Sequence, residues 1–342
     1  MTWKDRMNRR DTLLALLALG TAAGPRVAMP QSSPRIPTLG FLSLNPTPTS
    51  DAWDRTPFAI RLKELGWVEG KNIRIERAFA EKNAERLSVL AADLVRKQVD
   101  VIYTLGPQPA FAAAQATKTI PIVFFGPTFP IEMGLIDSYA RPGRNVTGVA
   151  WSAGVEVYVK LLSFVKELVP AAARVASLTV PTARPKLGGG YYPGATPQLE
   201  AAAKKMGFEL RAFDVAKPED FDGAFKAIQA WRPQAFYTTR NPVVSPEIQK
   251  IVDFANASRL PSLFDNRDFA VAGGLFSYGP EITSSIMQAV NKIDRILRGA
   301  KPADLPVEMP TRYEMVINRK TATTLGIKIP QSLLARADEV IG

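Results

Sequence analysis

The chain has 342 residues, 22% of them charged, and it carries 43 Lys and Arg against 32 Asp and Glu, a formal net charge of +11. It contains no Cys and no His, which excludes disulfides, thiolate nucleophiles, His-based catalytic triads and metal sites built from Cys or His. The length favours two domains of ordinary size, so a sizeable core needs neither a metal nor a disulfide to stabilise it.

The positive charges are scattered along the chain rather than gathered in runs. Proteins that bind nucleic acid concentrate basic residues on one face of a recognisable module. We therefore expect a solvated basic surface and no nucleic-acid partner.

The first 31 residues have the order of an export signal. Arg9 and Arg10 precede an apolar run at 13–23, and small residues follow as far as Ala28. This run is too short to span about 30 Å of hydrocarbon as a helix, but it matches the apolar region of a signal peptide. We expect residues 1–31 to be a signal peptide and the mature protein to be periplasmic. The paired arginines leave both Sec and twin-arginine export open.

In the first half of the chain, buried strands alternate with amphipathic helices. Such alternation is typical of βαβ units, in which right-handed crossovers build a parallel sheet. The predicted strands are 36–44, 72–79, 99–106, 120–126 and 145–151, and the predicted helices are 58–67, 84–98, 109–117 and 131–140.

The same alternation starts again in the second half, although the two halves are not a sequence repeat. The predicted helices are 155–170, 197–207, 219–231, 245–259 and 280–299, and the predicted strands are 173–180, 208–215, 234–240, 260–265 and 273–279. The pattern predicts two α/β units in tandem.

The basic segment 140–148, ARPGRNVTG, lies where the two units meet. A phosphate-binding loop would lead from a strand into a helix, with glycines at fixed offsets and a following Lys. Here the predicted order is helix, loop, strand, so we interpret the segment as a connector.

Several stretches resemble one known family. LKELGWVEGKNIRIE, GLIDSYARPGRNVTG, AVAGGLFSYGP and ILRGAKPADLPVEMPTRYEMVINRK, in this order, are similar to exported ABC-transporter substrate-binding proteins of the uncharacterised or tryptophan-type group. The resemblance implies a type I periplasmic-binding-protein fold, in which three crossovers join two Rossmann-like lobes with parallel-type sheets around a ligand cleft. It implies a first lobe of 36–150 plus 279–305 and a second lobe of 151–278 plus 306–342. The lobe to which 313–342 belongs stays open.

The chain departs from the family pattern at two places. Family members commonly carry Asp where this chain has Phe129, and Thr where it has Pro107 and Gln108. These departures suggest a cleft tuned to a more apolar or aromatic ligand.

Polar side chains follow two predicted strands of the second lobe, and ligands of open α/β sheets bind beyond such carboxyl ends. Arg267 could pair with a ligand carboxylate and Asp265 with an amine, or both could belong to a surface turn whose charges pair among themselves. Arg240 is a second possible anion partner, or part of a solvated loop.

Aromatic residues are the complementary candidates. Trp151 lies at the inferred first crossover, where its ring could stack on a ligand or fill the hinge core. The Gly-rich segment 187–194 lacks the Lys of a phosphate loop and is expected to be a mobile loop at the cleft edge. The full predicted ligand-binding set is Ser43, Gly106, Pro107, Gln108, Phe125, Gly126, Phe129, Trp151, Thr179, Thr239, Arg240, Asp265 and Arg267.

We therefore expect an exported solute-binding protein rather than an enzyme. It would capture a small molecule, carboxylate-bearing with an apolar or aromatic body, and deliver it to an ABC permease as a monomer without cofactor or metal. A periplasmic ligand-sensing module for a receptor would have the same fold and is one alternative. An exported α/β enzyme is the other, against which stand the missing His and Cys and the lack of a Gly-x-Ser-x-Gly elbow.

Overall fold

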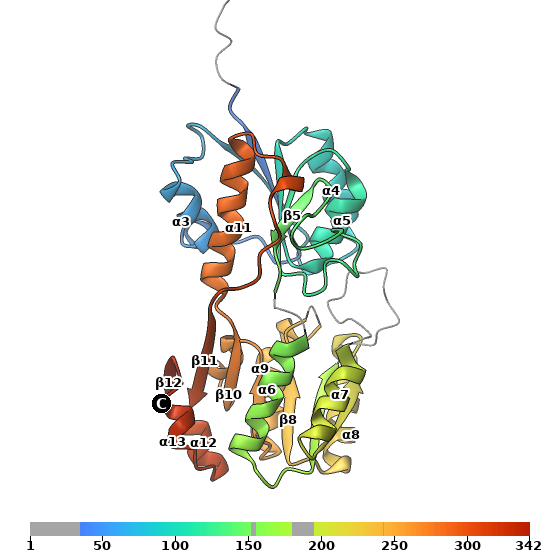
Figure 1. Ribbon diagram of the computed structural model, residues 1–342, viewed down its shortest axis with the longest axis vertical. Coiled ribbons are helices and arrows are strands. Elements are labelled where there is room, and N and C mark those ends of the chain that lie inside the picture. Colours follow the sequence, from blue (N-terminus) through green and yellow to red (C-terminus); the bar gives the residue numbers. More distant parts are fainter. Residues whose placement is uncertain (1–34, 152–154, 180–194, 242) are drawn as a thin grey trace, which may run out of the picture. The chain divides into compact units, whose positions relative to one another are not determined.

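The computed structural model describes residues 35–151, 155–179, 195–241 and 243–342. Pro37–Gly342 forms one folded unit, and two α/β lobes make it up (Figure 1). The predicted signal peptide and the Gly-rich segment 187–194 lie outside the described residues. Within the described ranges, no helix combines the length and the apolar character needed to cross a membrane.

The first lobe is built on a five-stranded parallel sheet in the order β2-β1-β3-β4-β5. Its central strands are almost entirely buried because helices cover both faces, which is why they read as continuous apolar runs. The strands are β1 (Thr38–Ser43), β2 (Arg74–Phe79), β3 (Val101–Leu105), β4 (Ile122–Phe125) and β5 (Val146–Val149), and the helices are α2 (Ser50–Asp54), α3 (Pro57–Glu64), α4 (Arg86–Arg96), α5 (Pro107–Ala116) and α11 (Ile282–Leu297).

One face of this sheet packs against α3 and α11, and the other against α4 and α5 (Figure 1). Helix α11 lies more than 200 residues beyond α3 in the chain, and hydrogen bonds join the two: Arg61 Nε donates to Asn291 Oδ1 at 2.8 Å. The chain therefore returns to the first lobe after building most of the second.

The second lobe is built on a seven-stranded sheet in the order β12-β11-β10-β9-β8-β6-β7. All neighbours are parallel except β10 and β11, which run antiparallel. The strands are β6 (Arg174–Thr179), β7 (Glu209–Asp214), β8 (Ala235–Thr238), β9 (Ser262–Phe264), β10 (Phe276–Pro280), β11 (Tyr313–Asn318) and β12 (Glu339–Ile341).

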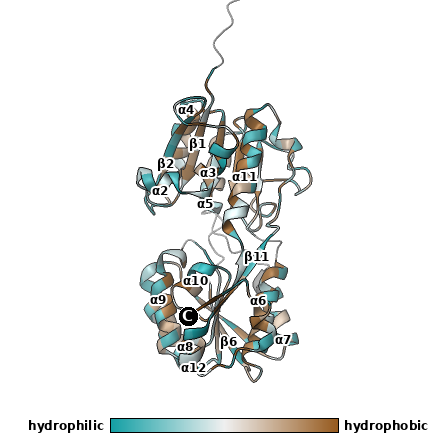
Figure 2. Cartoon of the chain, turned by 90° about the vertical axis from the view of Figure 1, so that its left-hand side faces the viewer, coloured by the Kyte–Doolittle hydropathy of each residue, from teal (hydrophilic) through white to brown (hydrophobic). Residues whose placement is uncertain are grey.

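Apolar helix faces cover both sides of this sheet, with α6, α7, α12 and α13 on one side and α8, α9 and α10 on the other. Figure 2 shows hydrophobic residues concentrated in the strands and hydrophilic ones on the outer helices. The α-helices are α6 (Val155–Leu168), α7 (Ala195–Lys205), α8 (Phe221–Trp231), α9 (Ile248–Ala257), α10 (Arg267–Val271), α12 (Arg319–Leu325) and α13 (Gln331–Leu334), with 3-10 turns at Pro218–Asp220, Ser245–Glu247 and Pro302–Asp304. The predicted α/β class with two lobes is confirmed.

One predicted element is wrong. Residues 131–140 form turns and bends instead of a helix. Gly134 has a φ of +69°, which ends any helical run there, and Leu135 donates its backbone N–H to the carbonyl of Pro130 across an isolated turn. The apolar residues whose spacing suggested a helix are buried all the same, because Leu135 and Ile136 of this loop pack into the core of the first lobe.

The last crossing between lobes falls after Glu308. Thr147 donates its hydroxyl to the Leu305 carbonyl at 2.7 Å, and Ala150 donates its backbone N–H to the Glu308 carbonyl at 2.9 Å. The chain then enters β11, so residues 313–342 complete the second lobe's sheet.

A buried lysine fixes this last segment to the first lobe. Lys292 of α11 is 1% exposed, and its Nζ donates to the Pro306 carbonyl and to Glu308 Oε1, both at 2.6 Å. Burial lowers the pKa of Lys292, while the hydrogen bond and the charge of Glu308 oppose this shift.

We expect Lys292→Met to lower the free energy of unfolding by about 1–3 kcal/mol, because the Pro306 carbonyl loses its donor. Urea unfolding at equilibrium measures this loss. Lys63→Met, on the exposed side of α3, is the matched control and should stay within about 0.5 kcal/mol of the parent. A Lys292 variant as stable as that control would contradict the role of the buried amine.

Candidate functional site

The predicted ligand-binding residues of the first lobe lie where its parallel strands end. Ser43 is the last residue of β1 and is fully buried, and its Oγ accepts a hydrogen bond from the Asn45 backbone at 3.1 Å. Pro107 and Gln108 open α5, and half-buried Phe129 follows β4 in the loop that begins at Gly126.

The ends of β3 and β4 approach each other very closely. Gly106 donates its backbone N–H to the Phe125 carbonyl at 2.7 Å. Gly106 and Gly126 have φ angles of +104° and +118°, a region that side chains other than glycine rarely adopt. A Cβ at Gly126 would lie 3.1 Å from the Gly106 Cα. The two glycines therefore allow the backbones on either side of Phe125 and Leu105 to pack closely where the strands end.

Trp151, Asp265 and Arg240 come together from three strand ends. Trp151 Nε1 donates to Asp265 Oδ2 at 3.3 Å, and the Arg240 backbone N–H donates to Asp265 Oδ1 at 2.6 Å. The Trp151 ring lies 5.9 Å from the Phe125 ring and 6.0 Å from the Arg240 guanidinium. A carboxylate, a guanidinium and two aromatic rings thus share one place, supplied by β4, β5, β8 and β9.

Asp265 is the most perturbed carboxylate of this group. The residue is 1% exposed, and burial raises its pKa from 3.8 to about 6. The Arg240 backbone N–H, the Trp151 indole and the Arg240 charge oppose the shift without cancelling it. At neutral pH the site therefore contains a desolvated negative charge that a cation could neutralise.

Arg240 is only lightly engaged. Its Nη1 lies 3.3 Å from Asp268 Oδ2, and the two side chains are 34% and 50% exposed. Such a long, solvated ion pair contributes little stability. Neighbouring Thr239 is buried, and Asn241 Oδ1 accepts from the backbone of Val243 and Val244, so the loop itself is held in place.

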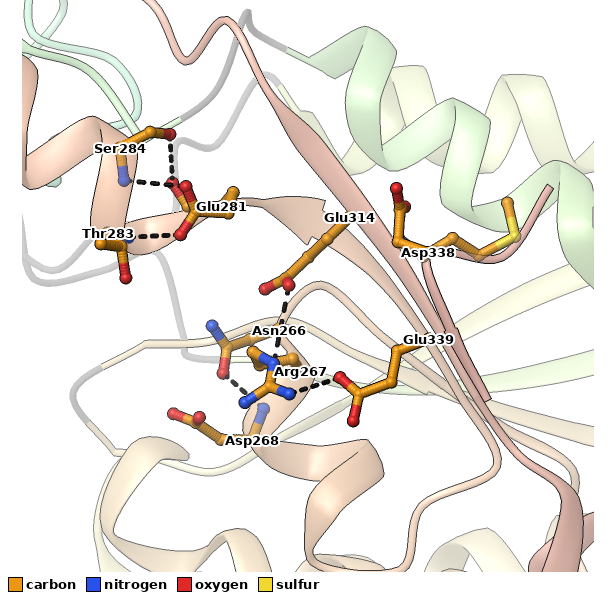
Figure 3. Close-up of polar contacts among 10 residues, drawn as sticks. Asn266, Arg267, Asp268, Glu281, Thr283, Ser284, Glu314, Asp338 and Glu339 are labelled. Atoms are coloured by element: carbon orange, nitrogen blue, oxygen red, sulfur yellow. Dashed lines mark hydrogen bonds and ion pairs between the residues drawn. The ribbon is translucent and has the colours of Figure 1, made fainter. Parts of the chain in front are cut away.

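Arg267, in contrast, is committed to other carboxylates. Its Nη2 lies 2.5 Å from Glu339 Oε2 of β12, and its Nε lies 3.6 Å from Glu314 Oε2 of β11 (Figure 3). The sequence analysis predicted that Arg267 would pair either with a ligand carboxylate or within its own turn. Neither alternative describes this arrangement, because the partners come from the last two strands of the sheet.

Thr179 also has a local partner. Its hydroxyl, at the end of β6, donates to Asp214 Oδ1 of β7 at 2.7 Å. The predicted residue therefore pairs two neighbouring strand ends of the second sheet.

Asn266 was missed by the sequence reasoning. It is 1% exposed, its Oδ1 caps α10 by accepting from the Asp268 backbone at 2.9 Å, and its buried Nδ2 has no hydrogen-bond partner among the described residues. An Asn directly before a short helix is the signal of such a cap.

Two hollows on the surface lie away from these strand ends. One of about 800 Å³ follows α7 and β7, and one of about 360 Å³ lies beside Pro37, Asp100 and the end of α11. Neither contains a residue of the predicted set. Among the described residues, no group of three or more acidic side chains is placed to hold a metal ion.

The raised pKa of Asp265 predicts a pH-dependent stability. Folding favours the protonated acid, so the stability that the acid form contributes at low pH is lost as the pH rises from about 3.8 through about 6. Asp265→Asn removes this loss. Between pH 4 and pH 7, the free energy of unfolding of this variant in urea should therefore rise relative to that of the parent by something on the order of 2–3 kcal/mol. Parallel stability curves for the two proteins would contradict this.

The comparisons with known proteins agree with this architecture. Residues 54–341 match the family model described as ABC transporter substrate binding protein. A tyrosine-binding protein of Clostridioides difficile (strain R20291) is 26% identical over 274 residues, 79% of this chain and 76% of that protein. A crystal structure of a conserved domain protein from Vibrio cholerae O1 biovar El Tor is 27% identical with a TM-score of 0.79, covering 90% of this chain and all of that one.

A Streptococcus pneumoniae ABC domain in complex with L-Trp has the same TM-score of 0.79 at 24% identity, covering 89% of this chain and 99% of that one. This likeness shows the fold, and it confirms the predicted type I periplasmic-binding architecture. The matched family is one of binding proteins and not of enzymes. The chain belongs to the family of ABC transporter substrate-binding proteins.

Proposed function

We propose that this chain is the exported binding component of an ABC importer and that it captures an amino acid with an aromatic side chain. The meeting of Asp265, Arg240 and Trp151 is the observation that carries the proposal. The name of the tyrosine-binding relative supports the ligand class.

The three groups of an aromatic amino acid each find a matching partner. The ammonium would bind the desolvated Asp265 carboxylate, which needs a cation to offset the cost of its burial. The ring would pack beside Trp151 and Phe125, whose rings already lie 5.9 Å apart. The carboxylate would pair with the guanidinium of Arg240.

We assign the carboxylate to Arg240 rather than to Arg267. The Arg267 guanidinium is bound by Glu339 and Glu314, and a ligand would have to displace those carboxylates. Arg240 gives up only a 3.3 Å contact with a half-exposed Asp268. A guanidinium that makes one side-chain hydrogen bond among the described residues is suited to bidentate recognition of a carboxylate.

Export and delivery complete the proposal. The basic and apolar order of residues 1–31 supports a signal peptide that is removed on the way to the periplasm. The monomeric protein would then present its ligand to a permease in the membrane. Deleting the gene should reduce cellular uptake of labelled tyrosine or tryptophan. Unchanged uptake by the deletion strain, when the purified protein binds these amino acids, would favour the sensing role.

The ligand class is tested by calorimetry with L-tyrosine and L-tryptophan, with tyramine, which lacks the carboxylate, and with 3-(4-hydroxyphenyl)propionate, which lacks the ammonium. We expect both incomplete analogues to bind at least about 30-fold more weakly, since losing one partner of a desolvated charge pair costs roughly 2–5 kcal/mol. A neutral sugar that binds more tightly than any amino acid would overturn the ligand class.

Arg240→Met should weaken binding of L-tyrosine by about 30-fold or more and binding of L-tyrosinamide by much less, because only the acid uses the guanidinium charge. Calorimetry with the two ligands gives the ratio. Arg319→Met, on the exposed start of α12, is the control. Equal losses for acid and amide would remove Arg240 from the carboxylate site.

Trp151 should report ligand binding. Its indole is a hydrogen-bond donor to Asp265, so an arriving ammonium changes its surroundings. Intrinsic fluorescence should respond to a bound amino acid, and Trp151→Phe should remove most of that response, while Trp53→Phe, in the first lobe's aromatic cluster, should not. A response that survives in Trp151→Phe would place this ring outside the site.

A further inference from the structure

The turn that carries Asp265 is in contact with the strands that connect the two lobes. Strands β10 and β11 form an antiparallel pair in which Gly279 faces Glu314 and Pro280 faces Tyr313. Directly beyond this pair, Glu281 donates its backbone N–H to the Arg312 carbonyl at 3.0 Å. We call this two-stranded segment, Phe276–Pro280 with Tyr313–Asn318, the connecting ribbon.

The connecting ribbon leads straight into the first lobe. Glu281 caps α11 by accepting hydrogen bonds from the backbone N–H groups of Thr283 and Ser284, each at 2.8 Å (Figure 3). Although burial would raise the pKa of Glu281, the hydrogen bonds from Ser284 and Thr283 lower it overall. The first-lobe helix therefore begins at the residue that directly follows the ribbon.

Two contacts join the Asp265 turn to one residue pair of the ribbon, Gly279 and Glu314, which face each other across the two strands. A Cβ at Gly279 would lie 1.7 Å from the Asp265 carbonyl oxygen, so the two backbones touch with no room for a side chain. On the opposite strand, Glu314 lies 3.6 Å from the Arg267 guanidinium. The segment 265–267, which carries the residue that the proposed function assigns to the ammonium, thus contacts both members of the Gly279–Glu314 pair.

The positive charge of Arg267 offsets the negative charges near the Gly279–Glu314 pair. Burial raises the pKa of Glu314, Arg267 lowers it, and Glu281, Asp338 and Glu339 raise it further. Figure 3 shows the Arg267 guanidinium joined to the carboxylates of Glu314 and Glu339. Removing Arg267 would leave mutually repelling carboxylates at the connecting ribbon, with Asp268 of the same turn adding to them.

We propose that Arg267, Glu314 and Gly279 couple occupancy of the Asp265 site to the connection between the lobes, so that Arg267 is a positioning residue and not a reader of the ligand carboxylate. This inference rests on the proposed function for the identity of the ligand. The coupling contacts themselves do not depend on that identity.

The absence of Cys from the chain makes a direct measurement simple. Val89→Cys on α4 and Ala227→Cys on α8, both at exposed positions, place one spin label on each lobe. Pulsed electron resonance then gives the distribution of distances between them. We expect Arg267→Met and Glu314→Gln each to shift this distribution in the ligand-free protein, and Arg267→Lys, which keeps the charge, to restore most of it. A distribution identical to that of the parent in both variants overturns the proposal.

Binding gives the second readout. Arg267→Met should weaken the binding of L-tyrosine and of L-tyrosinamide by the same factor, roughly 2- to 30-fold. Arg240→Met, in contrast, should weaken the binding of L-tyrosine much more than that of the amide. Glu314→Gln should reproduce the Arg267→Met loss, and the double variant should lose less than the product of the two single losses, because both remove one contact. A loss confined to the acid would make Arg267 a ligand contact, and multiplicative losses would separate it from Glu314; either result overturns the coupling.

The two proposals fail in different ways. If the parent protein binds no aromatic amino acid, the proposed function is wrong, and the ligand-free distance distributions still decide the coupling. If the parent binds and these distributions do not move, the coupling alone is wrong.

Discussion

A carboxylate removed from water has to be compensated by the groups around it, and Asp265 is such a carboxylate. Its two oxygens accept N–H groups from Trp151, which follows β5 of the first lobe, and from Arg240, which follows β8 of the second. These hydrogen bonds only partly offset the cost of burial, as the pKa of about 6 shows. The Trp151 indole and the Arg240 backbone, from different lobes, both donate hydrogen bonds to this one carboxylate.

The alternation of apolar strands and amphipathic helices was enough to predict most of the fold. Parallel strands buried on both faces give continuous apolar runs, and both sheets contain them. The pattern misled at 131–140, where apolar residues at helical spacing pack beneath a loop that Gly134 turns. The spacing of apolar residues therefore predicts which residues are buried, but it does not predict whether the backbone that carries them is a helix or a loop.

The candidate site was predicted in outline by the rule that ligands bind beyond the ends of parallel strands. That rule selected Arg240 and Asp265, the inferred first crossover selected Trp151, and the structure brings the three residues into contact. It could not predict the partners of Arg267, because Glu314 and Glu339 reach it only after β11 has joined the sheet antiparallel and β12 has added to its edge. Pairings between strands so far apart in the chain depend on the whole topology, and no local pattern encodes them.

The paired glycines at the ends of β3 and β4 limit which substitutions this edge of the first lobe can accept. Any side chain at Gly106 or Gly126 would adopt a strained backbone, and one at Gly126 would also push the two strand ends apart. Gln108 and Phe129, both half-buried, flank the two glycines, and the backbone imposes no such restriction on their side chains. Substitution at this edge of the sheet is therefore restricted at the two glycines themselves and not at the positions beside them.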